Sequence, residues 1–428
     1  MGYEKTTWDG QDDTELGCVA GLDLGKAELV CCVRGPDSDG SGHMVQEVTT
    51  WSTMMGSLTA LAEHLVDVGV ELVAMEATSD YWKPVFYRLE AHGLNAIVVN
   101  AKHFKHLPGR PKTDVLDAVW LARLAGKGML QPSFIPDQDI RRLRDLTRDR
   151  ADLVDQRTAV KNRVEKLLED ACVKLSVVIS DIFGVSGRLM MDALIAGQRD
   201  PVVLADLAQK RMKQKRAALI DALNGFFTDH HGFRLRLLLD RVDALTADID
   251  TLDARISQVV EPYRHQITQL NTIPGIATTN ATAIFAEIGP DMSHFATPAH
   301  LVSWAKYAPG VNESAGKSKG SGSTGKGNRY LARALGQSAV ATRRTSTFLG
   351  DRYRRLSRRI GKKKAQVAVG RSILVGVWHL LNDPDSTWKD LGPDHHVHTQ
   401  NTTPTTLNTH IHALQNLGYT VTLTRAPA

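Results

Sequence analysis

The chain is poor in cysteine, and the spacing of its cysteines excludes two kinds of scaffold. Only four occur in 428 residues, Cys18, Cys31, Cys32 and Cys172. They include no CxxC pair and form no even framework, so the sequence predicts neither a structural zinc site nor a disulfide-stapled fold. We therefore expect a reduced, cytoplasmic protein.

Long hydrophobic runs are also missing. No run approaches the roughly eighteen apolar residues of a membrane span, and Met1–Gly17 is polar and acidic, so we expect neither a membrane span nor a secretory signal. With 42% hydrophobic and 23% charged residues, the chain can still bury substantial cores, which excludes wholesale disorder. Its length fits two or three domains.

Positive charge is concentrated in one region. Between Leu301 and Arg371, 17 Lys or Arg residues stand against two acids, a net charge of +15. Since the whole chain carries +5, the remainder carries −10. This asymmetry predicts a polyanionic partner for that region, the alternative being a solvated basic helix.

The first part of the chain alternates between strand and helix patterns. Short apolar or β-branched runs predict strands at residues 18–23, 28–33, 44–50, 71–75 and 95–99. Helical periodicity predicts helices at 52–68, 81–92 and 113–125. Three meandering strands followed by alternating helices and strands are the order of a ribonuclease-H-like α/β fold, which we assign to residues 17–132.

The middle of the chain, residues 137–262, is helical. Apolar residues with a 3-4 spacing mark one seam, Leu235, Leu238, Val242, Leu245, Ile249, Leu252, Ile256 and Val259. This spacing is typical of a coiled coil, which would pair two copies of the chain as a dimer. An ordinary core helix of a bundle is an equal alternative. Residues 170–232 show further helical patterns, broken by glycines, that we cannot place.

The last part of the chain is predicted to be mainly helical over residues 263–382. Leu270–Gly289 gives two helical pieces around Pro274-Gly275, a turn that either holds a phosphate on outward N–H groups or is merely structural. A Gly- and Ser-rich loop and a basic helix from Arg329 follow. We expect residues 383–428 to form an extension with a β-like run at Tyr419–Thr424. Its histidines, His395, His396 and His398, are predicted to belong to a solvated segment.

Four acids stand at element ends where they could converge. Asp23 ends the first strand, Glu76 ends a later one, and Asp114 and Asp117 share one face of a helix. In a ribonuclease-H-like sheet the first and fourth strands are neighbours, and the last helix packs across their ends. Oxygen-only ligands favour Mg²⁺, and two ions about 4 Å apart would clamp the attacking and leaving oxygens of a phosphodiester. Any one acid alone could be a surface group or a helix cap.

Ser314 lies in the Gly- and Ser-rich loop. By composition this loop is a flexible linker. Its lysines Lys317, Lys319 and Lys326, with Arg329, could instead bind a scissile phosphate. A serine becomes a good nucleophile only beside a base or a metal ion, which the acid cluster could supply.

A phosphate-binding loop of the ATPase type is excluded. Gly320–Lys326 matches the first seven positions of that motif, but Gly327 stands where a Ser or Thr must hold magnesium, and no apolar strand precedes it.

The chain resembles the DEDD insertion-sequence transposases. These pair a RuvC-like N-terminal domain with a serine-bearing C-terminal transposase domain, and they are the bridge-RNA-guided recombinases of bacterial mobile elements. The likeness rests on four segments: GLDLGK (21–26), KTDVLDA (112–118), TIPGI (272–276) and KGNRYL (326–331).

The resemblance implies roles for these residues. Asp23, Glu76, Asp114 and Asp117 would bind magnesium, and Ser314 would form a covalent link to a DNA 5′ phosphate. The family usually has Gly directly after this serine. Ala315 stands there instead, so other loop serines remain alternatives: Ser318, Ser321 and Ser323.

The resemblance also implies partners. They are target and donor DNA, a structured guide RNA, and further copies of the chain in a dimer or tetramer, in which the acids of one subunit meet the serine of another. Residues expected to contact nucleic acid are Lys112, Lys317, Lys319, Lys326, Arg329, Arg333, Arg354, Arg355, Arg358 and Arg359.

Two other functions are compatible with the sequence. A RuvC-like junction-resolving endonuclease would use metal-activated water and no serine. A non-catalytic architectural nucleic-acid-binding protein would carry degenerate acids.

Overall fold

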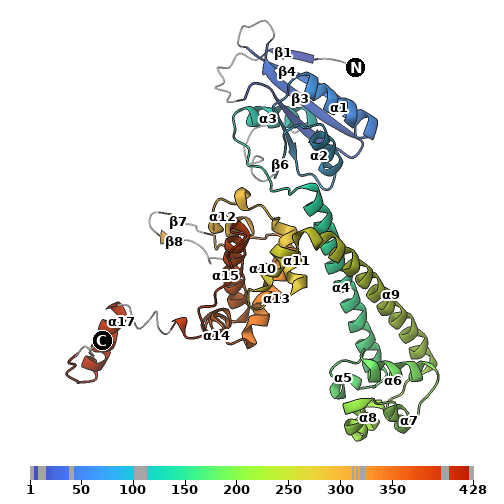
Figure 1. The fold of residues 1–428 in the computed structure, drawn as a ribbon. Coiled ribbons are helices and arrows are strands. Elements are labelled where there is room, and N and C mark those ends of the chain that lie inside the picture. Colours follow the sequence, from blue (N-terminus) through green and yellow to red (C-terminus); the bar gives the residue numbers. More distant parts are fainter. Residues whose placement is uncertain are drawn as a thin grey trace. The chain divides into compact units, whose positions relative to one another are not determined.

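The protein consists of two compact units, Met1–Ile135 and Pro136–Ala428, called below the N-terminal and C-terminal units. The N-terminal unit is α/β and the C-terminal unit is almost entirely helical (Figure 1). The structure, a computed structural model, describes residues 4–7, 16–37, 43–100, 113–310, 313–314, 317–318, 324–396 and 404–423.

A six-stranded mixed sheet forms the centre of the N-terminal unit. Its strands are β1 (Glu4–Thr7), β2 (Val19–Leu24), β3 (Glu28–Pro36), β4 (Met44–Ser52), β5 (Leu72–Glu76) and β6 (Ala96–Val99). Their order is β1-β4-β3-β2-β5-β6, antiparallel from β1 to β2 and parallel from β2 to β6. Strands β2 to β6 thus form a RuvC-like, ribonuclease-H-like sheet, which confirms the predicted fold. The sequence does not predict β1.

Helices cover both faces of this sheet. They are α1 (Met55–Asp67), α2 (Trp82–Ala91) and α3 (Asp114–Gly126). Leu22 and Leu24 of β2 pack in one core with α1 and α2, while α3 packs on the opposite face. Because side chains alternate along a strand, Gly21 and Asp23 lie on the face that α3 covers.

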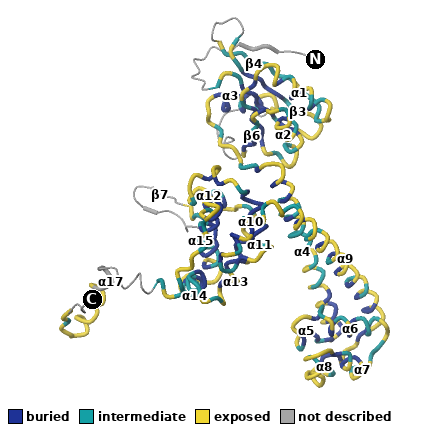
Figure 2. The backbone as a smooth tube through the Cα atoms, viewed as in Figure 1, coloured by how far each residue is buried: buried dark blue, intermediate teal, exposed yellow. Residues whose placement is uncertain are grey.

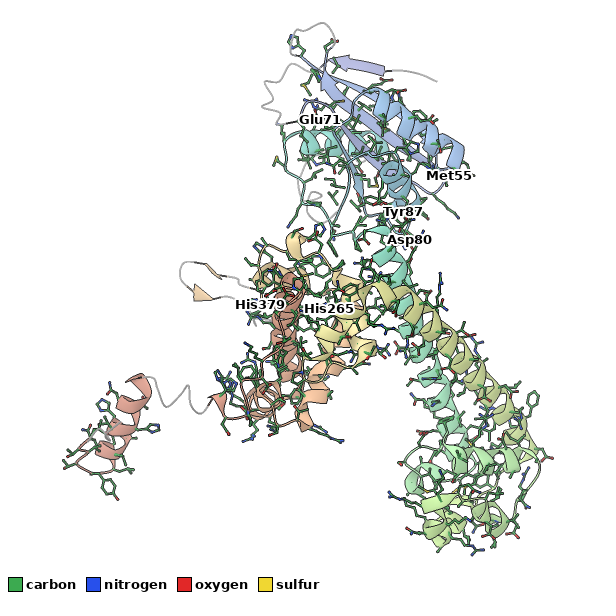
Figure 3. All side chains as sticks on the ribbon, viewed as in Figure 1. Met55, Glu71, Asp80, Tyr87, His265 and His379 are labelled. Atoms are coloured by element: carbon green, nitrogen blue, oxygen red, sulfur yellow. The ribbon has the colours of Figure 1, made fainter. Side chains whose placement is uncertain are left out.

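The start of β2 is tied to the chain just before β5. Oε1 of Glu71, a side chain labelled in Figure 3, accepts hydrogen bonds from the backbone N–H groups of Gly17 (3.0 Å) and Cys18 (3.3 Å). This contact fixes where β2 enters the sheet, and β2 carries Asp23.

Gly21 lies where α3 and β2 approach so closely that a side chain has no room. A Cβ atom at Gly21 would lie 2.3 Å from the carbonyl oxygen of Ala118 and 2.4 Å from the nitrogen of Ala122. Only glycine allows two backbones to come this close. The contact therefore sets the height of α3 above the sheet.

Two long helices form a hairpin at the start of the C-terminal unit, α4 (Gln138–Asp170) and α9 (Asp229–Val260). Arg150 binds Asp253, and Arg157 donates to Thr246 (3.3 Å), so the two helices run antiparallel. The apolar seam of α9 is therefore covered by α4 of the same chain, which favours the bundle-helix alternative over an intermolecular coil for this seam.

A small helical core closes the far end of this hairpin. The helices α5 (Leu175–Val178), α6 (Val185–Ile195), α7 (Pro201–Asp206) and α8 (Arg216–Leu223) share one buried apolar cluster with the ends of α4 and α9. Figure 2 shows buried residues in this core, whereas the middle of α4 is partly exposed. Helices this short carry too few turns to show periodicity, so the sequence could not place them.

A helical bundle follows, built from α10 (Arg264–Asn271), α11 (Thr278–Ile288), α12 (Pro298–Trp304), α13 (Arg329–Ala341), α14 (Phe348–Ile360) and α15 (Lys362–Asn382). The two helical pieces predicted around Pro274-Gly275 are confirmed as α10 and α11. Gly275 has a positive φ of 90°, and a Cβ there would lie 2.4 Å from the carbonyl oxygen of Ser338. This turn packs against α13, which favours its structural interpretation.

Residues 383–396, called here the strap, continue from α15 along the bundle. Nε2 of Gln269 donates to the carbonyl oxygens of Asp383 (3.0 Å) and Ser386 (2.8 Å). The rings of His395 and His396 lie 5.4 and 5.0 Å from that of Phe348. The strap is mostly exposed, as predicted for a solvated segment, but His395 and His396 are half-buried because their rings pack against Phe348. His398 lies outside the described residues.

The extension ends in α17 (Pro404–Asn416). Residues 419–423 form no strand, so the β-like run predicted at Tyr419–Thr424 is wrong over the part described, since no neighbouring strand pairs with it there. Across all described residues, no helix combines the length and the apolar character that crossing a membrane requires.

Candidate active site

Asp23 and Glu76 occupy equivalent positions on neighbouring parallel strands. The register pairs Gly21 with Ala74, and Leu22 with Met75, and each acid is the next residue on its strand. Neighbouring strands lie about 4.8 Å apart. The two carboxylates therefore start from adjacent backbone positions on the face that α3 covers.

The first turn of α3 carries the other two acids. Val19 packs in one cluster with Ala125, near the end of the helix, and Gly21 contacts Ala118, near its start. The helix therefore runs opposite to β2. Its first turn, with both aspartates of the DxxD segment, lies on the side of Gly21 where β2 continues to Asp23.

Thr113 fixes where α3 begins. Its Oγ1 accepts a hydrogen bond from the backbone N–H of Leu116 (3.3 Å), so Thr113 is the N-cap, and Asp114 and Asp117 lie in the first turn. Because Thr113 is the N-cap, Asp114 need not be interpreted as a helix cap. Negative charge in a first turn is favourable because of the helix dipole.

The four carboxylates differ in exposure. Glu76 is buried, Asp23 and Asp117 are half-buried, and Asp114 is exposed. In the part of the chain described, no three His, Cys, Asp or Glu side chains converge closely enough to hold a metal ion. The backbone thus brings the four acids to the same end of the sheet face that α3 covers, but their described side chains do not form a complete metal site. A donor set of carboxylates alone fits a hard divalent cation.

Cys31 and Cys32 lie on β3, beside β2. Burial raises the pKa of both thiols, that of Cys32 to about 12 even though Arg34 and Arg123 oppose the shift. Both thiols are therefore protonated at neutral pH and act as apolar core side chains, not as nucleophiles.

Ser314 belongs to a short hairpin in the C-terminal unit. Strand β7 (Glu313–Ser314) pairs with β8 (Lys317–Ser318), and Ser314 lies opposite Lys317. A bridge between Pro309 and Thr324 closes the loop behind it. The predicted contacts Lys112 and Lys319, the alternatives Ser321 and Ser323, and the side chains of Ser314, Lys317 and Ser318 lie outside the described part.

A buried carboxylate on α11 holds the end of this loop. Glu287 is 1% exposed. Arg148 donates from Nε to its Oε1 (2.7 Å) and from Nη2 to its Oε2 (2.8 Å). Nδ2 of Asn328 also donates to Oε2 (2.5 Å), and Arg144 donates to the Glu287 carbonyl oxygen (2.8 Å).

Two arginines share the charge of Glu287. Burial lowers the pKa of Arg144 to about 10, although Glu287 opposes the shift. Burial acts in the same direction on Arg148, but its hydrogen bonds and its attraction to Glu287 outweigh burial and raise its pKa. Both guanidinium groups are therefore charged at neutral pH.

Asn328 begins α13 as well as binding Glu287. Its Oδ1 accepts hydrogen bonds from the N–H groups of Tyr330 (2.9 Å) and Leu331 (3.2 Å). The Tyr330 hydroxyl donates to Asp152 Oδ2 (2.9 Å), and Arg329 binds the same carboxylate (2.9 Å). The KGNRYL segment is thus clamped to α4 and α11.

Reasoning from the sequence missed Glu287 and Arg148. One signal marks the first, because Glu287 is the only charged residue in the apolar segment 281–289. A buried acid needs a paired cation. The partner Arg148 is 139 residues away, and no local pattern identifies it.

Several predicted nucleic-acid contacts have protein partners. Arg329 and Arg333 form ion pairs with Asp152 (2.9 Å) and Asp155 (2.6 Å) of α4. Arg329 is exposed and Arg333 is half-buried, and solvent screens ion pairs at such positions, so both arginines can exchange a carboxylate for a phosphate at low cost.

Other predicted contacts lie on or near α14. Arg354 donates to the carbonyl oxygen of Thr345 (2.9 Å), and Arg355 lies 3.3 Å from Nε2 of His396. Lys326, Arg358 and Arg359 are exposed, and within the described residues none of these three pairs with a carboxylate.

Two transposase family models match long parts of the sequence. Residues 20–173 match the DEDD_Tnp_IS110 transposase model, and residues 267–354 match the model of the transposase IS116/IS110/IS902 family. Together they span more than half of the chain. The chain belongs to the IS110 family of transposases. The first match contains the four acids, and the second contains Ser314, Glu287 and Asn328.

Individual proteins resemble this transposase too. The insertion element IS900 uncharacterized 42 kDa protein of Mycobacterium paratuberculosis is 26% identical over 392 residues, which cover 85% of this chain and 95% of that protein. A Thermus thermophilus RuvC structure aligns with 17% identity over 27% of this chain and 99% of its own, with a TM-score of 0.21. RuvC in complex with a Holliday junction substrate gives 18% identity, the same shares and a TM-score of 0.20.

Membership of this family makes the transposase an enzyme of DNA phosphoryl transfer, and therefore a DNA-binding protein. Transposases with a DEDD acid set are typically metal-dependent. The carboxylate-only donor set on β2, β5 and α3 agrees with that chemistry.

Proposed function

We propose that the transposase cleaves and rejoins DNA in a magnesium-dependent reaction through a covalent link between Ser314 and a DNA 5′ phosphate. The observation that carries this proposal is the β2–β5 register, in which Asp23 and Glu76 are neighbours facing α3. With Asp114 and Asp117 they would hold Mg²⁺, a role that explains why four acids share one face. When bound, the metal ions would supply charge neutralisation at the phosphate and activation of the attacking oxygen.

The proposed step exchanges one phosphorus–oxygen bond for another. Oγ of Ser314 forms a bond to phosphorus, and the bond from phosphorus to the 3′ oxygen breaks. The serine loses its proton and the leaving oxygen gains one, so charge is balanced. Because the number of phosphate ester bonds stays the same, a DNA 3′ hydroxyl can attack the phosphoserine, reverse the step and rejoin a strand without a high-energy cofactor.

Guide RNA supplies the choice of sequence in this proposal, and the protein contacts mainly the nucleic-acid backbone. The composition of α14 supports this division. Its apolar residues Leu349, Tyr353 and Leu356 are buried, whereas Arg358 and Arg359 are exposed. Exposed arginines without carboxylate partners suit phosphate oxygens, which carry no sequence information.

We propose a dimer or tetramer in which the acids of one subunit act with the serine of another. Residues 17–132 would be the catalytic domain, 263–382 the serine-bearing domain, and 137–262 the region that joins subunits. Since α4 covers the seam of α9, contacts between subunits would use other surfaces of that region.

The test is to trap covalent protein–DNA adducts with wild-type protein, Ser314→Ala and a matched control, Ser318→Ala, in the presence of guide RNA and Mg²⁺. We expect adducts from wild type and Ser318→Ala only. Equal adduct yield from Ser314→Ala would contradict the assignment of the nucleophile.

The acids are tested by strand cleavage. Asp114→Asn and Asp117→Asn should abolish cleavage and leave RNA binding nearly intact, because each removes a charge needed only for the metal. Cleavage by Ser314→Ala but not by Asp114→Asn would indicate the RuvC-like nuclease with a water nucleophile. No cleavage by wild type would indicate an architectural protein.

A further inference from the structure

The root of the serine loop, residues 324–330, is held by side chains that have no part in the proposed chemistry. We propose that Glu287 is a positioning residue for strand cleavage, which acts through Asn328 to fix this root and so orient the loop that carries Ser314. This role rests on the proposed function of that loop.

The bonds at Glu287 leave it a single orientation. Arg148 meets both carboxylate oxygens as a two-pronged fork, which fixes the plane of the carboxylate. Oε2 also receives Nδ2 of Asn328, whose Oδ1 is engaged with the first turn of α13. Because both ends of the Asn328 side chain are bonded, neither the side chain nor the backbone that bears it can rotate freely.

The backbone before Asn328 is confined from the other side. A Cβ at Gly327 would lie 2.5 Å from the carbonyl oxygen of Ala305, at the end of α12. Thr324 forms a bridge with Pro309, where the chain enters the loop. Both ends of the loop are therefore fixed to one framework of α11, α12 and α13.

A purely stabilising role explains this network poorly. Replacement of a buried ion pair by apolar residues is often neutral or stabilising. A fork of hydrogen bonds instead fixes direction, and a reacting group displaced by about 1 Å can lose roughly 100-fold in rate. The network therefore suits a group that must be aimed.

The experiment uses Asn328→Asp, which keeps the oxygen that caps α13 but places an acceptor against Glu287. In the full-length protein with guide RNA and Mg²⁺, we measure single-turnover strand cleavage at saturating DNA. We expect a fall of about 10- to 100-fold with DNA affinity within about two-fold of wild type. Hydrogen exchange of residues 324–330 should become faster than that of the rest of the C-terminal unit. The new carboxylate beside buried Glu287 also lowers the melting temperature, so cleavage is measured at a temperature at which the variant stays folded.

Two further variants make the result decisive. Glu287→Gln should reproduce the slow cleavage if it folds, and if it does not fold, Asn328→Asp decides alone. Asp253→Asn is the matched control, since it breaks another arginine–carboxylate pair of α4, that with Arg150, and should cleave at the wild-type rate.

Unchanged cleavage by Asn328→Asp, or a fall explained by weaker DNA binding, would overturn the inference. Strand cleavage is the readout because it reports on either nucleophile. If Ser314→Ala still forms adducts, the proposed nucleophile fails, whereas the positioning role of Glu287 still stands or falls by the cleavage rate of Asn328→Asp.

Discussion

At the scale of single residues, the acids depend on a position that has no side chain. Gly21 allows α3 to lie on β2 with no room for a Cβ, and the first turn of α3 carries Asp114 and Asp117. The same strand continues to Asp23. A change of one methyl group at Gly21 therefore acts on three of the four acids at once.

We predict that Gly21→Ala destabilises the N-terminal unit by about 1–3 kcal/mol, the usual cost of overpacking, because α3 must move away from β2. Strand cleavage should fall by at least roughly 10-fold, since the first turn of α3 moves with the helix. Urea unfolding and single-turnover cleavage measure the two effects.

Gly56→Ala is the control for this prediction. Gly56 lies in α1 and a Cβ there meets no atom within 4 Å, so we expect a gain in stability of about 0.5–1 kcal/mol and normal cleavage. Wild-type stability and cleavage in Gly21→Ala would refute the importance of the close approach.

At the scale of elements, local signals were enough where one segment decides its own structure. The Thr113 cap and the spacing of Asp114 and Asp117 predicted α3, and the apolar run before Glu76 predicted β5. Together with the order of strands they predicted the sheet and the face on which the acids lie.

Partners distant in sequence could not be predicted. The spacing in α9 shows that an apolar seam exists but not which helix covers it, and α4 proves to be that helix. Likewise the lone charge of Glu287 does not reveal Arg148. The strand β1 could not be predicted for the same reason, because this polar segment becomes a strand only by pairing with the edge of β4.

The arginine face of α14 predicts a salt-dependent effect. Arg358→Ala together with Arg359→Ala should weaken nucleic-acid binding and reduce the slope of log affinity against log salt by roughly one unit for each phosphate that is no longer bound. Filter binding over a salt series measures this. Arg142→Ala is the control, because Arg142 is exposed but paired with Asp139 on α4. An unchanged slope in the double variant would exclude α14 from the interface.

The strap predicts a dependence on pH. Burial lowers the pKa of His396, as do Arg355, Arg352 and His395, while Asp351 opposes them. A docked His396 thus resists protonation more than a free one, so docking is fully stable above about pH 6.5 and weakens as pH falls below it. Hydrogen exchange of residues 384–396, corrected for intrinsic rates, should show less protection at about pH 5.5 than at about pH 8.

His396→Gln separates this effect from general acid sensitivity. This variant should lose most of the difference between the two pH values. Equal protection of the wild-type strap at both would contradict the role of His396.

At the scale of the whole molecule, the acids and Ser314 belong to different units of the chain. If the site is shared between subunits, an inactive acid variant and an inactive serine variant complement one another. In an exchanged equimolar mixture of Asp114→Asn and Ser314→Ala dimers, half of the dimers are mixed and each has one intact site. Cleavage should therefore recover to about a quarter of the wild-type level.

The control for complementation is a mixture of wild type with the double variant Asp114→Asn, Ser314→Ala. There each mixed dimer carries no intact shared site, so activity should fall to about a quarter. Absence of recovery in the first mixture, despite subunit exchange, would place acids and serine of one chain in the same site.

The unbroken length of α4 has a consequence for how such proteins can vary. Its 33 residues amount to about 50 Å of helix, with Arg148 about a third of the way along and Val164 in the small helical core at the far end of the hairpin. Removal of seven residues from α4 and seven from α9 would shorten the hairpin by about 10 Å and keep the same faces in register. The length of the α4–α9 hairpin can therefore change in steps of seven residues. Such a change leaves the contact between Arg148 and Glu287 intact.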